Sequence, residues 1–312
     1  RAPRAARTPS RARPRYPRGM QRAPGLGPLD AEEREDLARA FASEGFVVLE
    51  SALDPATCAT LLAAAQRLAS EHDFEADRGV FRTDDRDAGR DEAFFASARG
   101  VRGFLEAEAL DEQGRLRVPK AHALNKIGHA LHDLVPEVRA LAGSELVRDA
   151  FRIAGLDEAA LIQSMLIFKQ PEIGGEVRWH QDASYLRSAP QRVAGLWLAL
   201  EDADRDNGCL WMVPGAHRGP LRERYAVDWD TREGTLVTTD PTPWPEAEAV
   251  PLEVPAGSLV VFHDHMPHRS DLNRSARSRV ALTLHAHDQS AEWSADNWLQ
   301  RGELEPFVLG GR

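Results

Sequence analysis

The feature that most limits what this chain can fold into is a series of short strand-like segments in its second half. Gly, Pro, Asn and Asp turns separate these segments, which are rich in large apolar and β-branched residues. The segments are residues 160–170, 192–202, 208–215, 249–257, 258–265 and 278–288. A series of this kind predicts a β-sandwich or a β-barrel.

Two helices are expected ahead of these strands, because both have recognisable start signals. Residues 29–45 are predicted to be a helix with Asp30 as the N-cap and Glu33 three residues on, which is the spacing of a capping box. Residues 53–73 are predicted to be a second helix, capped by Asp54 and followed by a proline at the first helical position.

The rest of the N-terminal half is less regular. Residues 46–50 should form a short strand, and residues 74–120 are charged and irregular, with a hairpin expected at 110–119. Residues 124–156 are predicted to be helical, with a break before Pro136, because the residue before a proline disfavours the helical conformation. We expect the helices to pack on the outside of one sheet in a single α+β domain.

The first 28 residues differ in composition from the rest of the chain. They are rich in Arg and Pro and contain no acidic residue, so they cannot supply a hydrophobic core and are expected to be disordered. They are either upstream sequence ahead of a start at Met20, which we favour, or an organelle-targeting segment. Whether residues 1–19 are native stays open. The folded domain is predicted over residues 29–312.

Net charge and cysteine content exclude several classes of protein. The formal net charge of −10 argues against a general nucleic-acid binder and against binding to an anionic membrane surface. No apolar run approaches the length of a membrane span. Cys58 and Cys209 are far apart in the sequence, which excludes a disulfide framework and is typical of an intracellular protein. We expect a cytoplasmic protein with a small-molecule substrate, and we favour a monomer.

The first indication of chemistry is the sequence WHQDASYL at residues 179–186. His180 and Asp182 are separated by one residue, a pair that is expected about once by chance in a chain of this length. The pair follows a Gly-Gly turn and lies in an apparently extended segment. Residues two apart in a strand point to the same face, so this imidazole and this carboxylate could hold one metal ion. A third ligand has to come from elsewhere in the chain.

The candidates for the third ligand lie in the segment GSLVVFHDHMPHRSDLNRSARSRVAL. His263, His265 and His268 follow a strand, and Arg279 begins another strand eleven residues after the last of them. We expect this second strand to lie beside the strand ahead of His268. Two imidazoles and one carboxylate leave coordination positions open, which suits Fe(II) chemistry with oxygen. A buried Arg that faces the same cavity could bind the far carboxylate of a co-substrate through a planar two-bond fork.

Together these segments resemble the phytanoyl-CoA dioxygenase family of Fe(II)- and 2-oxoglutarate-dependent oxygenases. The shared pattern is His180-x-Asp182 followed by His268 and Arg279, and HRSDLNRSARSRVAL is similar to the family's His-x-Ser…Asn-x-Ser…Arg block. DNGCLWMVPGAH resembles its Asn-Gly-Cys-Leu…Pro-Gly-Ser-His turn, with Ala216 in place of Ser. One subgroup is more similar still, over NKIGHALH, QSMLIFKQP, GGEVRWHQDASYL, GLWLALEDADRDNGCLW and WSADNWLQ.

The resemblance extends from about Leu29 to the C-terminus and implies a double-stranded β-helix, or jelly-roll, core. It implies that His180, Asp182 and His268 bind Fe(II), in preference to the two neighbouring histidines. It also implies that Arg279 binds the far carboxylate of 2-oxoglutarate.

In the most similar subgroup, the positions that match Lys126, Met165 and Trp197 also line the co-substrate pocket. Taken alone, a lysine in a helical run would be solvated, and a methionine or tryptophan in an apolar strand would be a core residue. His285 and His287 have the same strand parity as Arg279. Their roles stay open between packing or hydrogen bonding and contact with the substrate.

The implied activity is that of a dioxygenase that uses O2. It would convert 2-oxoglutarate to succinate and CO2 while hydroxylating a small molecule that the sequence does not identify. The family name suggests an acyl-CoA, but no basic cluster here is typical of a site for CoA phosphates. Two alternatives stay open: a non-catalytic metal-binding β-helix module, and a cupin-type metal-dependent hydrolase or isomerase. The second gives Arg279 no task and predicts activity without O2 or 2-oxoglutarate.

Overall fold

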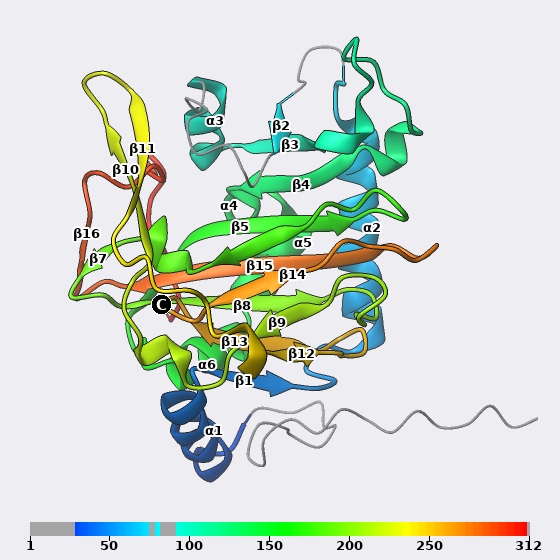
Figure 1. Cartoon of the computed structure of the whole chain (residues 1–312). Coiled ribbons are helices and arrows are strands. Elements are labelled where there is room, and N and C mark those ends of the chain that lie inside the picture. Colours follow the sequence, from blue (N-terminus) through cyan, green and yellow to red (C-terminus); the bar gives the residue numbers. More distant parts are fainter. Residues whose placement is uncertain (1–28, 75–78, 82–91, 311–312) are drawn as a thin grey trace, which may run out of the picture.

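The computed structural model describes residues 29–74, 79–81 and 92–310. Its framework is a sandwich of a large and a small sheet, both mainly antiparallel, with helices on the outer face of the large sheet (Figure 1). This is the predicted double-stranded β-helix with helices outside one sheet. The disorder predicted for residues 1–28, and part of the charged segment 74–120, lie outside the described residues.

The large sheet supplies most of the framework. Its strands, in hydrogen-bonded order, are β1 (Phe46–Leu49), β13 (Leu259–His263), β8 (Val193–Ala199), β15 (Arg279–Asp288), β5 (Ala159–Lys169), β4 (Leu124–His129), β3 (Val101–Glu106) and β2 (Val80–Phe81), and β17 (Phe307–Val308) also pairs with β5. β15 was expected to lie beside β13. That expectation is wrong, because β8 lies between them.

The small sheet faces the large one and has the order β12 (Val250–Leu252), β9 (Leu210–Met212), β14 (His268–Ser270), β6 (Val177–His180). Two further pairs lie at one end of the sandwich: the hairpin of β10 (Glu223–Asp228) with β11 (Glu233–Thr238), and β7 (Ser188–Ala189) with β16 (Glu292–Trp293). Figure 1 shows the β10–β11 hairpin extending beyond the sheets.

The helices are α1 (Ala31–Glu44), α2 (Pro55–Glu71), α3 (Glu92–Ala96), α4 (Leu131–Leu134), α5 (Pro136–Ala142) and α6 (Glu145–Ile153). The predicted capping box of α1 is present, since the Asp30 side chain accepts from the Glu33 backbone and the Glu33 side chain accepts from Asp30. Asp54 caps α2 as predicted. Gly45 ends α1 with φ at 81°, and a side chain there would collide with His217.

Two apolar clusters show how the sandwich is held together. The larger one lies between the helices and the outer face of the large sheet, and includes Leu166, Leu196 and Leu282. The smaller one lies between the two sheets and includes Trp197 and Met212. Alternate residues of the same strand therefore enter different clusters, as the two-residue period of a strand requires.

The prediction of one helical segment over residues 124–156 is only partly right. The break before Pro136 is present, but Leu124–His129 forms β4. β4 lies between β3 and β5, and all six of its residues are buried. A strand covered on both faces loses the polar–apolar alternation that identifies strands in a sequence. Lys126 is therefore a strand residue and not a residue of a solvated helix.

Candidate active site

The small sheet brings two of the predicted ligands together. His180 ends β6 and His268 begins β14, and the two residues are directly paired across these antiparallel strands. Their ring centroids are 4.1 Å apart. Strand pairing thus places two imidazoles side by side that are far apart in the sequence.

Asp182 lies beside these two histidines, but its local backbone structure differs from the predicted strand. It is not in a strand with His180 but begins a single 3-10 turn, Asp182–Ser184, directly after β6. Its Oδ1 lies 3.6 Å from Nε2 of His180 and 3.8 Å from Nε2 of His268. The candidate ligand atoms of the three residues all lie within 4.8 Å of one another. This spacing is suitable for one metal ion.

Hydrogen bonds orient each of these side chains. Nδ1 of His180 donates to the carbonyl of Arg178 at 2.8 Å, and Nδ1 of His268 donates to the carbonyl of Met266 at 2.9 Å. In the neutral form of each imidazole this leaves Nε2 unprotonated, which is the atom that a metal needs. A third contact joins Oδ2 of Asp182 to Nε2 of His285 at 2.8 Å.

The environment favours the protonation states that bind metal. Burial, together with the neighbouring His180, lowers the pKa of His268 to about 4, so its ring is neutral at pH 7. Burial by itself raises the pKa of the Asp182 carboxyl. The effects of His285, His268 and His180 together outweigh burial and hold that pKa well below its ordinary value. The site thus contains a neutral imidazole at His268 and an ionised carboxylate at Asp182.

Arg279, the first residue of β15, is buried beneath the small sheet and is only 1% exposed. Its Nη2 donates to the carbonyl of Gly208 at 3.0 Å, and its guanidinium lies over the ring of Trp197 at 5.4 Å from the centroid. Nε and Nη1 are buried and have no hydrogen-bond partner among the described residues. A buried cation with unused donors is costly unless an anion meets it.

Two buried ionisable residues were not predicted: Lys169, which lies near Arg279, and Glu106, which lies near Lys169. Lys169 lies opposite Arg279 across β5 and β15, and it donates to the carbonyls of Gly175 and Ser270. Burial, followed by the nearby charge of Arg279, lowers the pKa of Lys169 to about 7. Burial also raises the pKa of Glu106, which accepts from the Gly175 backbone at 3.0 Å. The sequence shows no signal for this cluster, because it forms only by long-range pairing.

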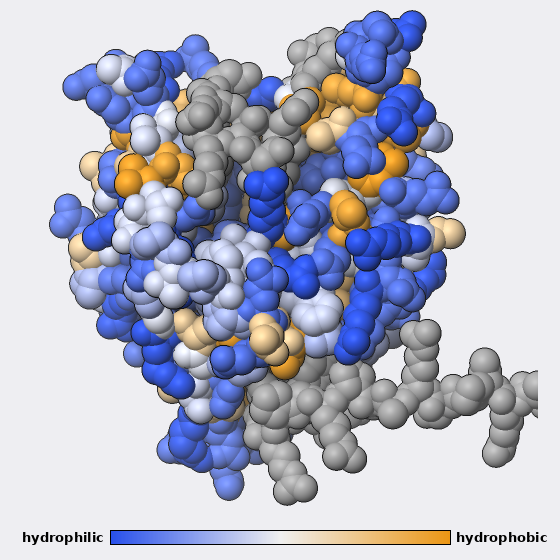
Figure 2. Space-filling view, viewed as in Figure 1, coloured by the Kyte–Doolittle hydropathy of each residue, from blue (hydrophilic) through white to orange (hydrophobic). Residues whose placement is uncertain are grey.

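A cavity of about 590 Å³ opens beside two of the three candidate ligands. Lys126 and Met165 line it together with His180 and Asp182. Trp197 and Arg279 are buried and are not among the residues that line it. The aromatic residues of the wall are Phe94, Trp179, Tyr185, Tyr225, Trp244 and Trp298. Figure 2 shows a mostly hydrophilic surface in this view, with a few hydrophobic patches.

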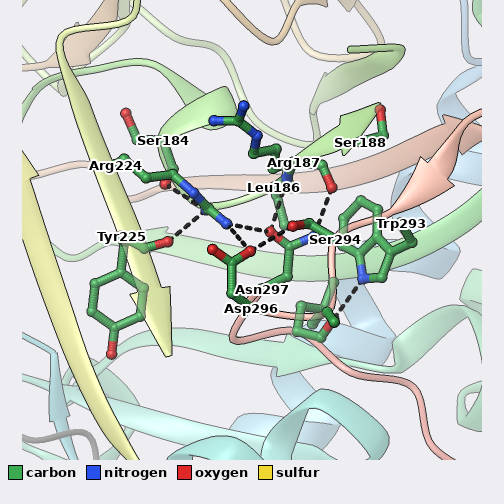
Figure 3. A network of polar contacts seen from close by, with 12 residues as sticks. Ser184, Leu186, Arg187, Ser188, Arg224, Tyr225, Trp293, Ser294, Asp296 and Asn297 are labelled. Carbon is green, nitrogen blue, oxygen red and sulfur yellow. Dashed lines mark hydrogen bonds and ion pairs between the residues drawn. The ribbon is translucent and has the colours of Figure 1, made fainter. Parts of the chain in front are cut away.

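A polar network fixes one wall of the cavity (Figure 3). The guanidinium of Arg224, on β10, pairs with Asp296 and donates to the carbonyl of Ser184 and to Oδ1 of Asn297, each at 3.3 Å. Asn297 in turn exchanges hydrogen bonds with the backbone of Arg187 at 3.0 and 2.8 Å. The network therefore joins the hairpin, the C-terminal segment and the residues that follow Asp182.

The competing histidines occupy other environments. His263 ends β13, and its Nδ1 accepts from the backbone of His265 at 3.0 Å. Neither residue belongs to the cluster of candidate ligands. His287 packs against Trp293, with ring centroids 5.2 Å apart, whereas His285 contacts Asp182. The two histidines are two residues apart in one strand, but their contacts differ, so their spacing in the sequence does not predict a shared role.

The fold and the cluster together define a class: a double-stranded β-helix protein with two histidines and one carboxylate beside an internal cavity. The particular family follows from sequence comparison. A family profile described as phytanoyl-CoA dioxygenase (PhyH) matches residues 41–281. The chain belongs to this family, and the resemblance seen in its motifs is confirmed.

Individual relatives cover nearly the whole chain. Phytanoyl-CoA dioxygenase 1 of Oryza sativa subsp. japonica is 40% identical over 89% of this chain and 96% of its own length. Phytanoyl-CoA dioxygenase domain-containing protein 1 of Mus musculus is 38% identical over 86% of this chain and 94% of its own. Both relatives therefore align with this chain along almost their entire lengths.

Solved structures share the fold at low sequence identity. The epimerase SnoN, crystallised with Fe3+, alpha ketoglutarate and nogalamycin RO, aligns with a TM-score of 0.62 at 17% identity, covering 88% of this chain and 93% of that one. EvdO2 from Micromonospora carbonacea var. aurantiaca, complexed with 2-oxoglutarate, aligns with a TM-score of 0.54 at 24% identity, covering 89% and 100%. None of the helices in the described ranges is long and apolar enough to cross a membrane.

Proposed function

We propose that this protein is an Fe(II)- and 2-oxoglutarate-dependent dioxygenase. In this proposal His180, Asp182 and His268 bind the iron, and the catalytic domain extends over residues 29–312. Two imidazole nitrogens and one carboxylate oxygen form the donor set that Fe(II) oxygenases use, and it leaves positions open for a co-substrate and O2. The family and the geometry of the three side chains both support this assignment.

The observation that carries the proposal is the buried guanidinium of Arg279. Its unpartnered Nε and Nη1 form a binding site for an anion inside the sandwich. We assign this site to the far carboxylate of 2-oxoglutarate. Burial lowers the pKa of Arg279 to about 10, so the side chain stays positively charged at neutral pH. A protein that only binds a metal ion would not require a buried cation at this position.

Three further residues complete the co-substrate pocket in this proposal. Met165 and Trp197 both lie opposite Thr283 of β15, on its two sides, so the strands that carry them flank the path from the metal site to Arg279. Lys126 lines the cavity next to Met165 and lies 5.4 Å from the ring centroid of Phe104. Apolar walls exclude water and strengthen the attraction between Arg279 and a carboxylate.

Iron with 2-oxoglutarate supplies the activation of O2 and the oxidation of a C–H bond; the chain's own side chains perform no acid–base step. The three ligands fix the metal, Arg279 orients the co-substrate, and the aromatic wall holds an organic molecule beside the metal. We propose hydroxylation as the outcome. Asp182 supplies the carboxylate ligand, so the donor set has no vacancy at that position for a halide.

The test is the formation of succinate from 2-oxoglutarate by the purified protein with Fe(II) and O2, followed by a screen for metabolites that accelerate it. Succinate that depends on both Fe(II) and O2, and that is lost in His268→Ala, is the expected result. Absence of succinate from iron-loaded protein under every condition would leave a non-catalytic metal-binding module. Turnover of a substrate without O2 or 2-oxoglutarate would instead indicate a hydrolase or isomerase.

A further inference from the structure

The two oxygens of Asp182 have different environments. Oδ1 faces Nε2 of both His180 and His268, at 3.6 and 3.8 Å. Oδ2 points the other way and meets Nε2 of His285 at 2.8 Å. An ionised carboxylate has no hydrogen to give, so Nε2 of His285 is the donor in this contact. One oxygen is thus directed to the cluster, and the other is already bound.

His285 is itself held rigidly. Its side chain is 4% exposed, and it lies on β15 between Gln163 of β5 and Gly195 of β8. The absence of a side chain at Gly195 makes room for the ring of Phe262, since a Cβ there would come within 2.4 Å of that ring. Phe262 contacts the edge of His285, with ring centroids 6.2 Å apart. Burial and this ring contact therefore restrict the movement of the imidazole.

The backbone of Asp182 is anchored independently of His285. Its carbonyl accepts from the backbone of Tyr185 at 2.9 Å and of Leu186 at 3.0 Å. The residues that follow are tied to the C-terminal segment through Asn297 (Figure 3). These contacts place the Cα of Asp182 but leave its side-chain rotation free. Among the described residues, His285 is the one whose side chain hydrogen-bonds the carboxylate.

We propose that His285 is a positioning residue that restricts Asp182 to one-oxygen coordination of the metal; this inference rests on the proposed function. A carboxylate that used both oxygens would occupy one more coordination position. That position is needed, because a chelating co-substrate and O2 together fill all the sites that three protein ligands leave open. His285 thus supports metal affinity and keeps the last site available, without touching the metal or the substrate.

The test uses Co(II), which reports on coordination through its visible spectrum and requires no turnover. His285→Leu removes the donor at similar bulk, and His285→Gln keeps an N–H donor of similar reach. His287→Leu is the matched control on the same strand, because His287 packs against Trp293 instead. His285→Leu should lose on the order of 10–100-fold in Co(II) affinity and change the Co(II) spectrum. His285→Gln should recover most of both, and the control should match the unmodified protein.

Thermal unfolding of each variant without metal separates positioning from folding. If His285→Leu does not fold, His285→Gln is compared with His285→Asn instead. Both side chains end in an amide, but that of Gln is longer, so His285→Gln should bind Co(II) normally and His285→Asn should not. Unchanged affinity and spectrum in His285→Leu, or equal behaviour of the two amides, would overturn the inference. Failure of the proposed function is a distinct result, namely unmodified protein that binds Co(II) but makes no succinate with Fe(II).

Discussion

Replacing Arg279 by Ala should separate co-substrate binding from metal binding. Arg279 is 1% exposed, so solvent does not screen its interaction with a carboxylate. Removing one partner of a buried ion pair costs about 3–5 kcal/mol. At about 1.4 kcal/mol per decade, the apparent affinity for 2-oxoglutarate should fall by roughly two to four decades. Iron binding should persist, because none of the three candidate ligands is altered.

Two companion variants sharpen this prediction. Arg279→Lys should recover only part of the affinity, since an ammonium group cannot reproduce a planar fork. Arg277→Ala is a matched control: Arg277 is an exposed arginine two residues away that pairs with Asp204, and its loss should leave 2-oxoglutarate binding unchanged.

The assay combines metal content, the 2-oxoglutarate dependence of succinate formation, and thermal unfolding with and without the co-substrate. A ligand at one hundred times its dissociation constant stabilises a protein by about 2.7 kcal/mol, so the unmodified protein should show a clear rise in Tm that Arg279→Ala lacks. If Arg279→Ala retains its iron and a near-native apparent affinity for 2-oxoglutarate, Arg279 does not bind the co-substrate and the pocket has been assigned wrongly.

Three further outcomes are expected. His268→Ala should lose stoichiometric Fe(II) while His265→Ala keeps it, because only His268 belongs to the cluster; metal analysis of the dialysed proteins decides this. Because Asp182 is the proposed carboxylate ligand, no chlorinated product should form in chloride buffers, as mass spectrometry of the products would show. Lys169 has a pKa of about 7, against about 10.4 in an unfolded chain, so the unfolded state binds more protons between these values and stability should rise with pH there. Lys169→Met should lose that slope, at most about 1.4 kcal/mol per pH unit, in urea unfolding at pH 7, 8 and 9.

The sequence predicted those parts of the structure that local chemistry determines. The capping box at Asp30 and Glu33 and the cap at Asp54 are present, because these interactions involve residues close together in the chain. The strands after residue 160 were recognisable from their turns. The candidate metal ligands near the Gly-Gly turn before β6 and around His268 were also recognisable, because their residue types and their order along the chain match a known motif.

The sequence did not predict features that depend on distant partners. β4 was read as helix because both of its faces are covered, and a buried strand has no alternating pattern. The expectation that β13 and β15 are neighbours was wrong because β8 lies between them, and the local sequence of an apolar strand does not specify its partner. The contact between His285 and Asp182 joins residues 103 positions apart. Only the folded sandwich shows that one of two equivalent-looking histidines meets the carboxylate.

The candidate metal ligands and the candidate anion site are carried by different sheets. His180 and His268 are paired on the small sheet, whereas Arg279, Met165 and Trp197 belong to the large sheet. The His285–Asp182 contact joins the two sheets at the metal end. The candidate metal ligands therefore lie in or directly after strands of the small sheet, whereas the candidate anion site lies on the large sheet. In the proposed function 2-oxoglutarate contacts both the metal and Arg279, so its binding requires both sheets of the sandwich to be in place.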